Sequence, residues 1–180
     1  MRTFVVVMIN PLDLIQVKAF ARIDGLLLSV TWMASMACLM FRPESSWGFL
    51  LMLCTPFFVG WRLSEFRNKV LDGAISFRRA LCFSCYVFFY ASLIFALAQY
   101  IYFRYIDNGE FMSWMGAAVN LLAEAYKQQG IEVADIKEQT ELIAQIGPVN
   151  LTFMFMMQNL MYGAMLSVII AVIGKKKRKE

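Results

Sequence analysis

The pair Cys82 and Cys85 has the residue types and spacing for thiol chemistry, because two cysteines separated by two residues can form and exchange a disulfide. Such exchange requires an exposed thiolate and a second cysteine pair that can accept the disulfide. The other cysteines, Cys38 and Cys54, are isolated from each other within apolar stretches. A thiol oxidoreductase is therefore our third hypothesis, behind the interpretation that Cys82 and Cys85 are small residues packed in a helix.

The chain contains no histidine. Histidine is the commonest general base and the commonest metal ligand in proteins, so its absence narrows the possible chemistry. The sequence predicts no catalytic residue, no metal site and no cofactor. We interpret the protein as non-enzymatic.

The four cysteines lie in long apolar stretches of the sequence. Hydrophobic residues make up 60% of the 180 residues and charged residues 17%, which is more apolar than a soluble domain. Four stretches lack charge over the 17 to 25 residues, roughly, that a membrane-spanning helix requires. They predict an all-α integral membrane fold in a single domain, residues 1–180, with spans at about 20–41, 45–61, 80–103 and 148–174.

The second stretch, residues 45–61, is the shortest and contains Pro56. A re-entrant segment that enters and leaves the membrane on one side is the alternative for a stretch of this length. Trp47 and Trp61 lie near its two ends, where tryptophan favours the membrane interface, so we predict a full crossing.

The distribution of basic residues predicts the orientation. Of 17 Lys and Arg residues, one predicted side holds only Arg42, Arg104, Lys127 and Lys137. Basic residues gather on the cytoplasmic side of membrane proteins, so the N-terminus, the predicted 62–79 loop and the C-terminus should be cytoplasmic. We therefore predict a multi-pass protein of the bacterial inner (plasma) membrane. The same bias explains the net charge of +4. We therefore predict no nucleic-acid partner.

Residues 107–147 form the one long segment on the opposite side. Apolar residues at helical spacing predict a first amphipathic helix after Asn108-Gly109 and a second one over residues 132–146. This two-helix insertion between spans three and four lies on the outer leaflet or caps the bundle. The sequence leaves open whether the insertion contacts lipid or protein.

The fourth span carries small and polar residues at every fourth position. Such a stripe is typical of a close contact between helices, either within the chain or with a partner helix. An amide next to it could also line a polar site. The stripe consists of Asn159, Gly163, Ser167 and Ala171, and the amide next to it is that of Gln158.

Arginines at the cytoplasmic ends of the spans are candidate ligands for lipid headgroups, because guanidinium groups suit phosphate. The candidates are Arg22, Arg78 and Arg79. Asp24 and Arg62 should lie in the same interfacial layer, and the alternative is that all of these charges only fix topology. The predicted spans contain no buried carboxylate, which argues against a proton-coupled pump.

The motif Asp72-Gly-Ala-Ile-Ser-Phe-Arg-Arg-Ala80, together with the segment 101–107, resembles the signature of an uncharacterised bacterial family of four-span membrane proteins. The resemblance covers the chain from about Ala19 onward. That family is known as a domain of unknown function, so the resemblance implies no catalytic residues. It is loosely associated with neighbouring genes for polyprenyl-phosphate glycosyltransferases, which implies a role in assisting such an enzyme.

We therefore predict a non-enzymatic inner-membrane subunit, anchor or scaffold. Its expected partners are membrane lipids and either another membrane protein or a second copy of the chain. The alternative function is the binding or transport of an anionic lipid.

Overall fold

The computed structural model describes residues 11–42, 44–128 and 146–176, and the side-chain environments of these residues except 11–13, 119 and 121–128. Every regular element in the described part of the chain is helical, apart from one isolated backbone bridge. Four of these helices, one of them interrupted, are long and apolar enough to cross a membrane. The prediction of an all-α fold with four membrane-spanning helices is therefore confirmed.

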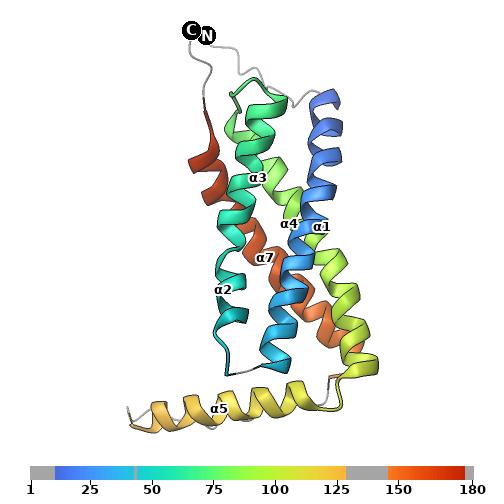
Figure 1. Cartoon of the computed structure of the whole chain (residues 1–180), viewed down its shortest axis with the longest axis vertical. Helices are drawn as coiled ribbons and strands as arrows, with labels where there is room; N and C mark the ends of the chain where they lie inside the picture. Colours follow the sequence, from blue (N-terminus) through green and yellow to red (C-terminus); the bar gives the residue numbers. More distant parts are fainter. Residues whose placement is uncertain (1–10, 43, 129–145, 177–180) are drawn as a thin grey trace, which may run out of the picture. The chain divides into compact units, whose positions relative to one another are not determined.

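The helices follow one another in the order shown in Figure 1. Their bounds are α1 Pro11–Phe41, α2 Trp47–Leu53, α3 Thr55–Val70, α4 Phe77–Ile101, the π-helix η1 Tyr102–Ile106, α5 Glu110–Gln128 and α7 Pro148–Gly174. The last of these coincides with the predicted fourth span, whereas the other three helical spans are longer than the charge-free stretches. In the first three spans the helix therefore continues beyond the charge-free stretch into residues that carry charge.

The second span consists of α2 and α3, which follow one course beside α1 (Figure 1). The interruption at Cys54 has its cause in Pro56, which lacks a backbone N–H and so removes one helical hydrogen bond. The bonds from Cys54 N to Leu50 O and from Phe58 N to Cys54 O, 3.0 and 2.9 Å long, keep the two helices in line. The combined span of 24 residues, Trp47–Val70, is long enough for a full crossing.

The predicted 62–79 loop is wrong over its first half, because α3 continues as a helix to Val70. The charged residues of this first half suggested a loop. In the structure they belong to α3, and Arg62 among them pairs with Asp24 of α1. Only residues 71–76 connect α3 to α4.

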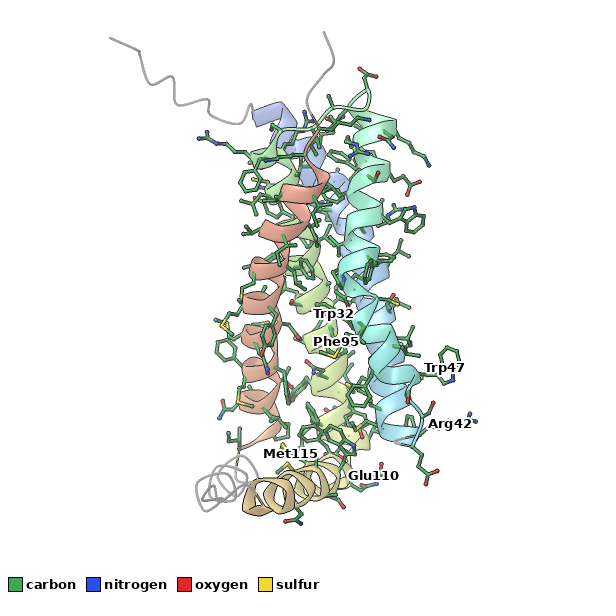
Figure 2. All side chains as sticks on the ribbon, turned by 90° about the vertical axis from the view of Figure 1, so that its left-hand side faces the viewer. Trp32, Arg42, Trp47, Phe95, Glu110 and Met115 are labelled. Atoms are coloured by element: carbon green, nitrogen blue, oxygen red, sulfur yellow. The ribbon has the colours of Figure 1, made fainter. Side chains whose placement is uncertain are left out.

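The chain divides into two compact units, residues 1–95 with 157–180 and residues 96–156. In the first unit, α1 runs antiparallel to α2 and α3 and parallel to α4, as shown by the order of their contacts. Trp32 of α1 is central to this arrangement: its Nε1 donates to Thr55 Oγ1 at 3.0 Å, and its ring packs against Phe88 and Phe95. Figure 2 shows Trp32 and Phe95 inside the unit and Trp47 pointing away from it.

The second unit contains η1 and α5 and an aromatic cluster. Phe103 packs against both Phe111 and Phe155, with ring centroids 5.1 and 6.1 Å apart. Asp107 Oδ1 accepts a hydrogen bond from Phe111 N at 3.0 Å and so satisfies one free N–H in the first turn of α5. The first predicted helix of the insertion corresponds to α5, and the second lies outside the described residues.

Candidate functional site

A row of alternating charges connects α1 to α3. Asp24 of α1 is 1% exposed, and one of its oxygens lies 2.6 Å from Arg62 Nε and 2.5 Å from Arg62 Nη2. Arg62 also pairs with Glu65, whose other oxygen lies 2.5 Å from Lys69 Nζ. We call these four residues the α1–α3 ion-pair row: Asp24, Arg62, Glu65 and Lys69.

The ion-pair row corrects the expectation that the spans contain no buried carboxylate. Asp24 lies within the part of α1 that is long and apolar enough to cross a membrane, Leu14–Phe41, and its side chain is buried. Burial of a carboxylate is tolerated here because Arg62 supplies both the opposite charge and a hydrogen bond from its Nε. The row alternates in sign and its members satisfy one another, so its chemistry is that of an internal brace.

A second polar arrangement joins α1 to α4. Arg79 Nη2 donates a hydrogen bond to Gln16 Oε1 at 2.7 Å. Lys18 Nζ lies 5.3 Å from the centre of the Tyr86 ring. In the same way, the Arg22 guanidinium lies 5.9 Å from the centre of the Tyr90 ring. Arg22 Nε also lies 3.5 Å from the Tyr90 hydroxyl, and the two tyrosine rings stack with centroids 6.2 Å apart. We call this set the α1–α4 seam: Gln16, Lys18, Arg22, Arg79, Tyr86 and Tyr90.

Helical spacing explains why these residues share the seam. Lys18 and Arg22 are four positions apart on α1, and Tyr86 and Tyr90 are four positions apart on α4, so each pair lies on one face of its helix. Arg79 lies seven positions before Tyr86 on nearly the same face of α4. Its guanidinium contacts Gln16 and lies 5.9 Å from the centre of the Phe66 ring of α3. Because α1 and α4 are parallel, the pairs meet in register.

Gly25 allows α1 and α4 to approach each other next to the seam. A Cβ atom at Gly25 would lie 2.7 Å from Tyr90 Cβ and 2.9 Å from the Val87 carbonyl oxygen. Both distances are shorter than a carbon atom can tolerate, so only glycine fits there without a shift of α4. The close approach places Tyr90 directly beside the first turn that follows Arg22.

The seam has an excess of positive charge. From Leu14 onward, the only carboxylate on α1 is Asp24, and α4 has none. Asp24 is bonded to Arg62, and among the described residues no carboxylate forms an ion pair with Lys18 or Arg22. Arg22 is exposed and Lys18 is half-buried, so both cations are within reach of a ligand.

The three predicted headgroup arginines do not form one cluster in the structure. Arg22 and Arg79 both belong to the seam. Arg78 is exposed and lies about 100° around α4 from Arg79, so it faces another direction. The sequence interpretation did not include Lys18, Tyr86 and Tyr90, although the matching four-residue spacings on α1 and α4 were visible.

The C-terminal end of α7 is joined to the connection between α3 and α4. Ile75 N donates to Lys176 O at 2.9 Å, and Lys176 N donates to Ile75 O at 3.0 Å. Arg67 Nη1 donates to Gly174 O at 3.0 Å and so satisfies one of the last carbonyls of α7. We call these contacts the C-terminal clasp. It holds Lys175 and Lys176 beside part of the motif Asp72–Ala80.

The small-residue stripe of α7 faces the interior of the chain. Gly163, Ser167 and Ala171 are buried, Asn159 is half-buried and Gln158 is exposed. A Cβ atom at Gly163 would lie 2.7 Å from both Cβ and Cγ of Phe88, so this position packs against α4. Ser167 Oγ donates to the Gly163 carbonyl oxygen at 2.7 Å, within α7. The stripe is thus an internal packing surface at these three positions.

Cys82 and Cys85 are both half-buried, unpaired thiols in the second and third turns of α4. Among the described residues, no group of three His, Cys, Asp or Glu side chains is arranged to hold a metal ion. The seam is therefore the arrangement with the clearest capacity to bind a ligand, because Lys18 and Arg22 lie beside phenol groups and form no ion pair with a described carboxylate.

Comparisons with known proteins agree with the predicted resemblance to a family of unknown function. No curated protein and no solved structure matches the chain. A family model described as "Protein of unknown function (DUF4199)" matches residues 24–176, from the buried Asp24 to the clasp residue Lys176. The matched range contains Arg62, Tyr86 and Tyr90, whereas Lys18 and Arg22 precede it. The chain belongs to this DUF4199 family of unknown function.

Proposed function

We propose that this protein binds an anionic lipid at the α1–α4 seam. The observation that carries the proposal is the pair Lys18 and Arg22, each held over a tyrosine ring and neither paired with a described carboxylate. Arg62, by contrast, pairs with Asp24 and braces the fold. An anionic headgroup would supply the charge that the seam lacks.

The position of the seam along α1 agrees with the depth of a headgroup. From Arg22 to Phe41 the helix extends over about 29 Å at 1.5 Å per residue, close to the roughly 30 Å of a hydrocarbon core. Arg22 therefore lies at one boundary of the apolar layer when Phe41 lies at the other. We place this boundary on the cytoplasmic side of a bacterial inner membrane, because most basic residues lie at this end of the helices.

The alternative role, a subunit or scaffold that assembles through the fourth span, loses the stripe on which it rested. Gly163, Ser167 and Ala171 are covered by the chain itself. A partner helix would have to use the opposite face of α7, which carries exposed residues such as Met157, Met161 and Met165. Lipid chains cover such a face equally well, so we place lipid binding first.

The test is native mass spectrometry of the protein extracted in mild detergent and supplied with phosphatidylglycerol or phosphatidylcholine. The double variant Lys18→Gln/Arg22→Gln should lose about 10- to 30-fold in retention of the anionic lipid, at roughly 1 kcal/mol per interfacial charge. Arg42→Gln is the matched control, since it removes one charge at the opposite end of α1.

Two results would contradict the proposal. One is a double variant that retains as much phosphatidylglycerol as the parent protein. The other is a parent protein that retains phosphatidylcholine equally well. A stoichiometric protein partner found in the same spectra would instead support the subunit role, including assistance to a polyprenyl-phosphate glycosyltransferase if the partner is such an enzyme.

A further inference from the structure

We infer that the α1–α4 seam selects lipids whose headgroup is a terminal phosphate monoester over lipids with a phosphate diester. This inference rests on the proposed function and specifies its ligand. A monoester carries nearly two negative charges at neutral pH and three terminal oxygens, whereas a diester carries one charge and two such oxygens.

The number and spacing of the donors fit a single terminal phosphate. Lys18 and Arg22 are one helical turn apart, a rise of about 6 Å, so both flexible side chains can reach the same phosphorus centre. The Tyr90 hydroxyl lies 3.5 Å from Arg22 Nε and offers a third donor beside them. Two cations and a phenol match the two charges and three oxygens of a monoester.

The seam offers nothing to the ammonium group of a zwitterionic headgroup. An ammonium is bound by a carboxylate or by the open face of an aromatic ring. From Leu14 onward, α1 has only Asp24, which pairs with Arg62, and α4 has no carboxylate. The faces of Tyr86 and Tyr90 are already covered by Lys18 and Arg22. Choline or ethanolamine esters would therefore leave their positive charge beside two cations.

The surroundings of the seam identify the occupant as a lipid. Exposed apolar side chains follow Arg22 along the same face of α1, at Leu26 and Val30, and exposed Phe89 and Leu93 accompany Tyr90 on α4. A phosphate at Arg22 would thus have its hydrocarbon chain against apolar residues on both helices. Free phosphate would gain nothing from these side chains.

Protonation of the ligand gives this inference a distinctive test. A phosphate monoester loses its second proton near pH 6, whereas a diester keeps one charge throughout the range from about pH 5 to pH 8. The charged and titratable groups that face or back the site are Lys18, Arg22 and Asp24 of α1, Arg79, Tyr86 and Tyr90 of α4, and Arg62, Glu65 and Lys69 of α3. Any titration of these groups would act on both kinds of lipid, so the comparison between lipids isolates the phosphate.

The experiment measures retention of phosphatidic acid, phosphatidylglycerol and phosphatidylcholine by the parent protein at about pH 5 and about pH 8. We expect the ratio of phosphatidic acid to phosphatidylglycerol to rise about five- to tenfold with pH, because one added charge meets two cations. The Lys18→Gln/Arg22→Gln variant should abolish this rise, and Arg42→Gln should preserve it. Tyr90→Phe keeps the ring and should halve the rise or reduce it further.

Three other outcomes would each contradict a different part of the inference or of the proposed function. Equal retention of phosphatidic acid and phosphatidylglycerol at both pH values, each above phosphatidylcholine, overturns monoester selection and leaves anionic-lipid binding intact. No excess of either anionic lipid over phosphatidylcholine overturns the proposed function itself. Inorganic phosphate that displaces phosphatidic acid at equal concentration overturns the lipid as occupant and identifies a free-anion site.

Discussion

Arg62 places both Nε and Nη2 on a single oxygen of Asp24, a residue 38 positions earlier in the chain, at distances of 2.6 and 2.5 Å. This pair joins the antiparallel helices α1 and α3. Asp24 points toward α3, while Arg22, two positions earlier, points toward α4. About half a turn of α1 thus separates Asp24, which is paired with Arg62, from Arg22, which has no carboxylate partner among the described residues.

Removal of Arg62 alone should destabilise the protein, because it leaves a buried carboxylate without its counter-charge. We expect Arg62→Met to lower the free energy of unfolding by about 3 kcal/mol. The double variant Asp24→Asn/Arg62→Met should recover most of the loss. Thermal unfolding in detergent provides the measurement, and Lys69→Gln, at the exposed end of the row, should leave the midpoint unchanged. A double variant no more stable than Arg62→Met would disprove the pairing argument.

Gly25→Ala should loosen the contact between α1 and α4. The added Cβ would overlap Tyr90 Cβ and the Val87 carbonyl, and overpacking of this kind destabilises by about 1 to 3 kcal/mol. Gly60→Ala is the control, since no atom lies within 4 Å of a Cβ there and alanine is the better helix former. Unfolding midpoints should fall for Gly25→Ala and stay level or rise for Gly60→Ala. The opposite order would show that α1 and α4 do not meet at Gly25.

Gly163→Leu should reduce stability without changing the number of copies in the assembly. Its side chain would meet Phe88 inside the chain, whereas Gln158→Leu alters an exposed position of the same helix and should be tolerated. Light scattering of the purified variants reports mass, and thermal unfolding reports stability. If Gly163→Leu instead dissociated an oligomer at an unchanged unfolding temperature, the stripe would be a contact surface for a partner helix.

The Tyr102 hydroxyl is buried and has no hydrogen-bond partner among the described residues. A buried hydroxyl without a partner destabilises the folded state by about 1 kcal/mol or more. We therefore expect Tyr102→Phe to raise the unfolding midpoint, with Tyr105→Phe, an exposed tyrosine of the same π-helix, unchanged. A lower midpoint for Tyr102→Phe would mean that the hydroxyl is satisfied in the membrane, by water or a ligand.

The sequence was sufficient to predict the four helices of membrane-spanning length, because a charge-free stretch of that length has few alternatives. It was insufficient for the ends of the helices. Arg62, Glu65 and Lys69 look like loop residues in the sequence, yet they continue α3 because a charge on α1 pairs with the first of them. That pairing depends on the relative orientation of two helices, which no local pattern contains.

The candidate site was predictable only in part for the same reason. Arg22 and Arg79 were identified as cations of the interfacial layer, and the structure places both in the seam. Arg78 resembled them in type and position along the chain, but one residue of helix turns it away. Tyr86 and Tyr90 looked like ordinary residues of an apolar span until the parallel packing of α1 and α4 set them against Lys18 and Arg22.

The C-terminal clasp has a consequence for biogenesis. The contacts among α1, α3 and α4 described above all lie within the first 95 residues, so these helices can assemble while the rest of the chain is still being translated. The clasp cannot form until Lys176 has left the ribosome, since it joins Ile75 to the residues after α7. The packing of α7 against Phe88 and the pairing of Lys176 with Ile75 thus come after the assembly of α1, α3 and α4, and the clasp joins segments about one hundred residues apart.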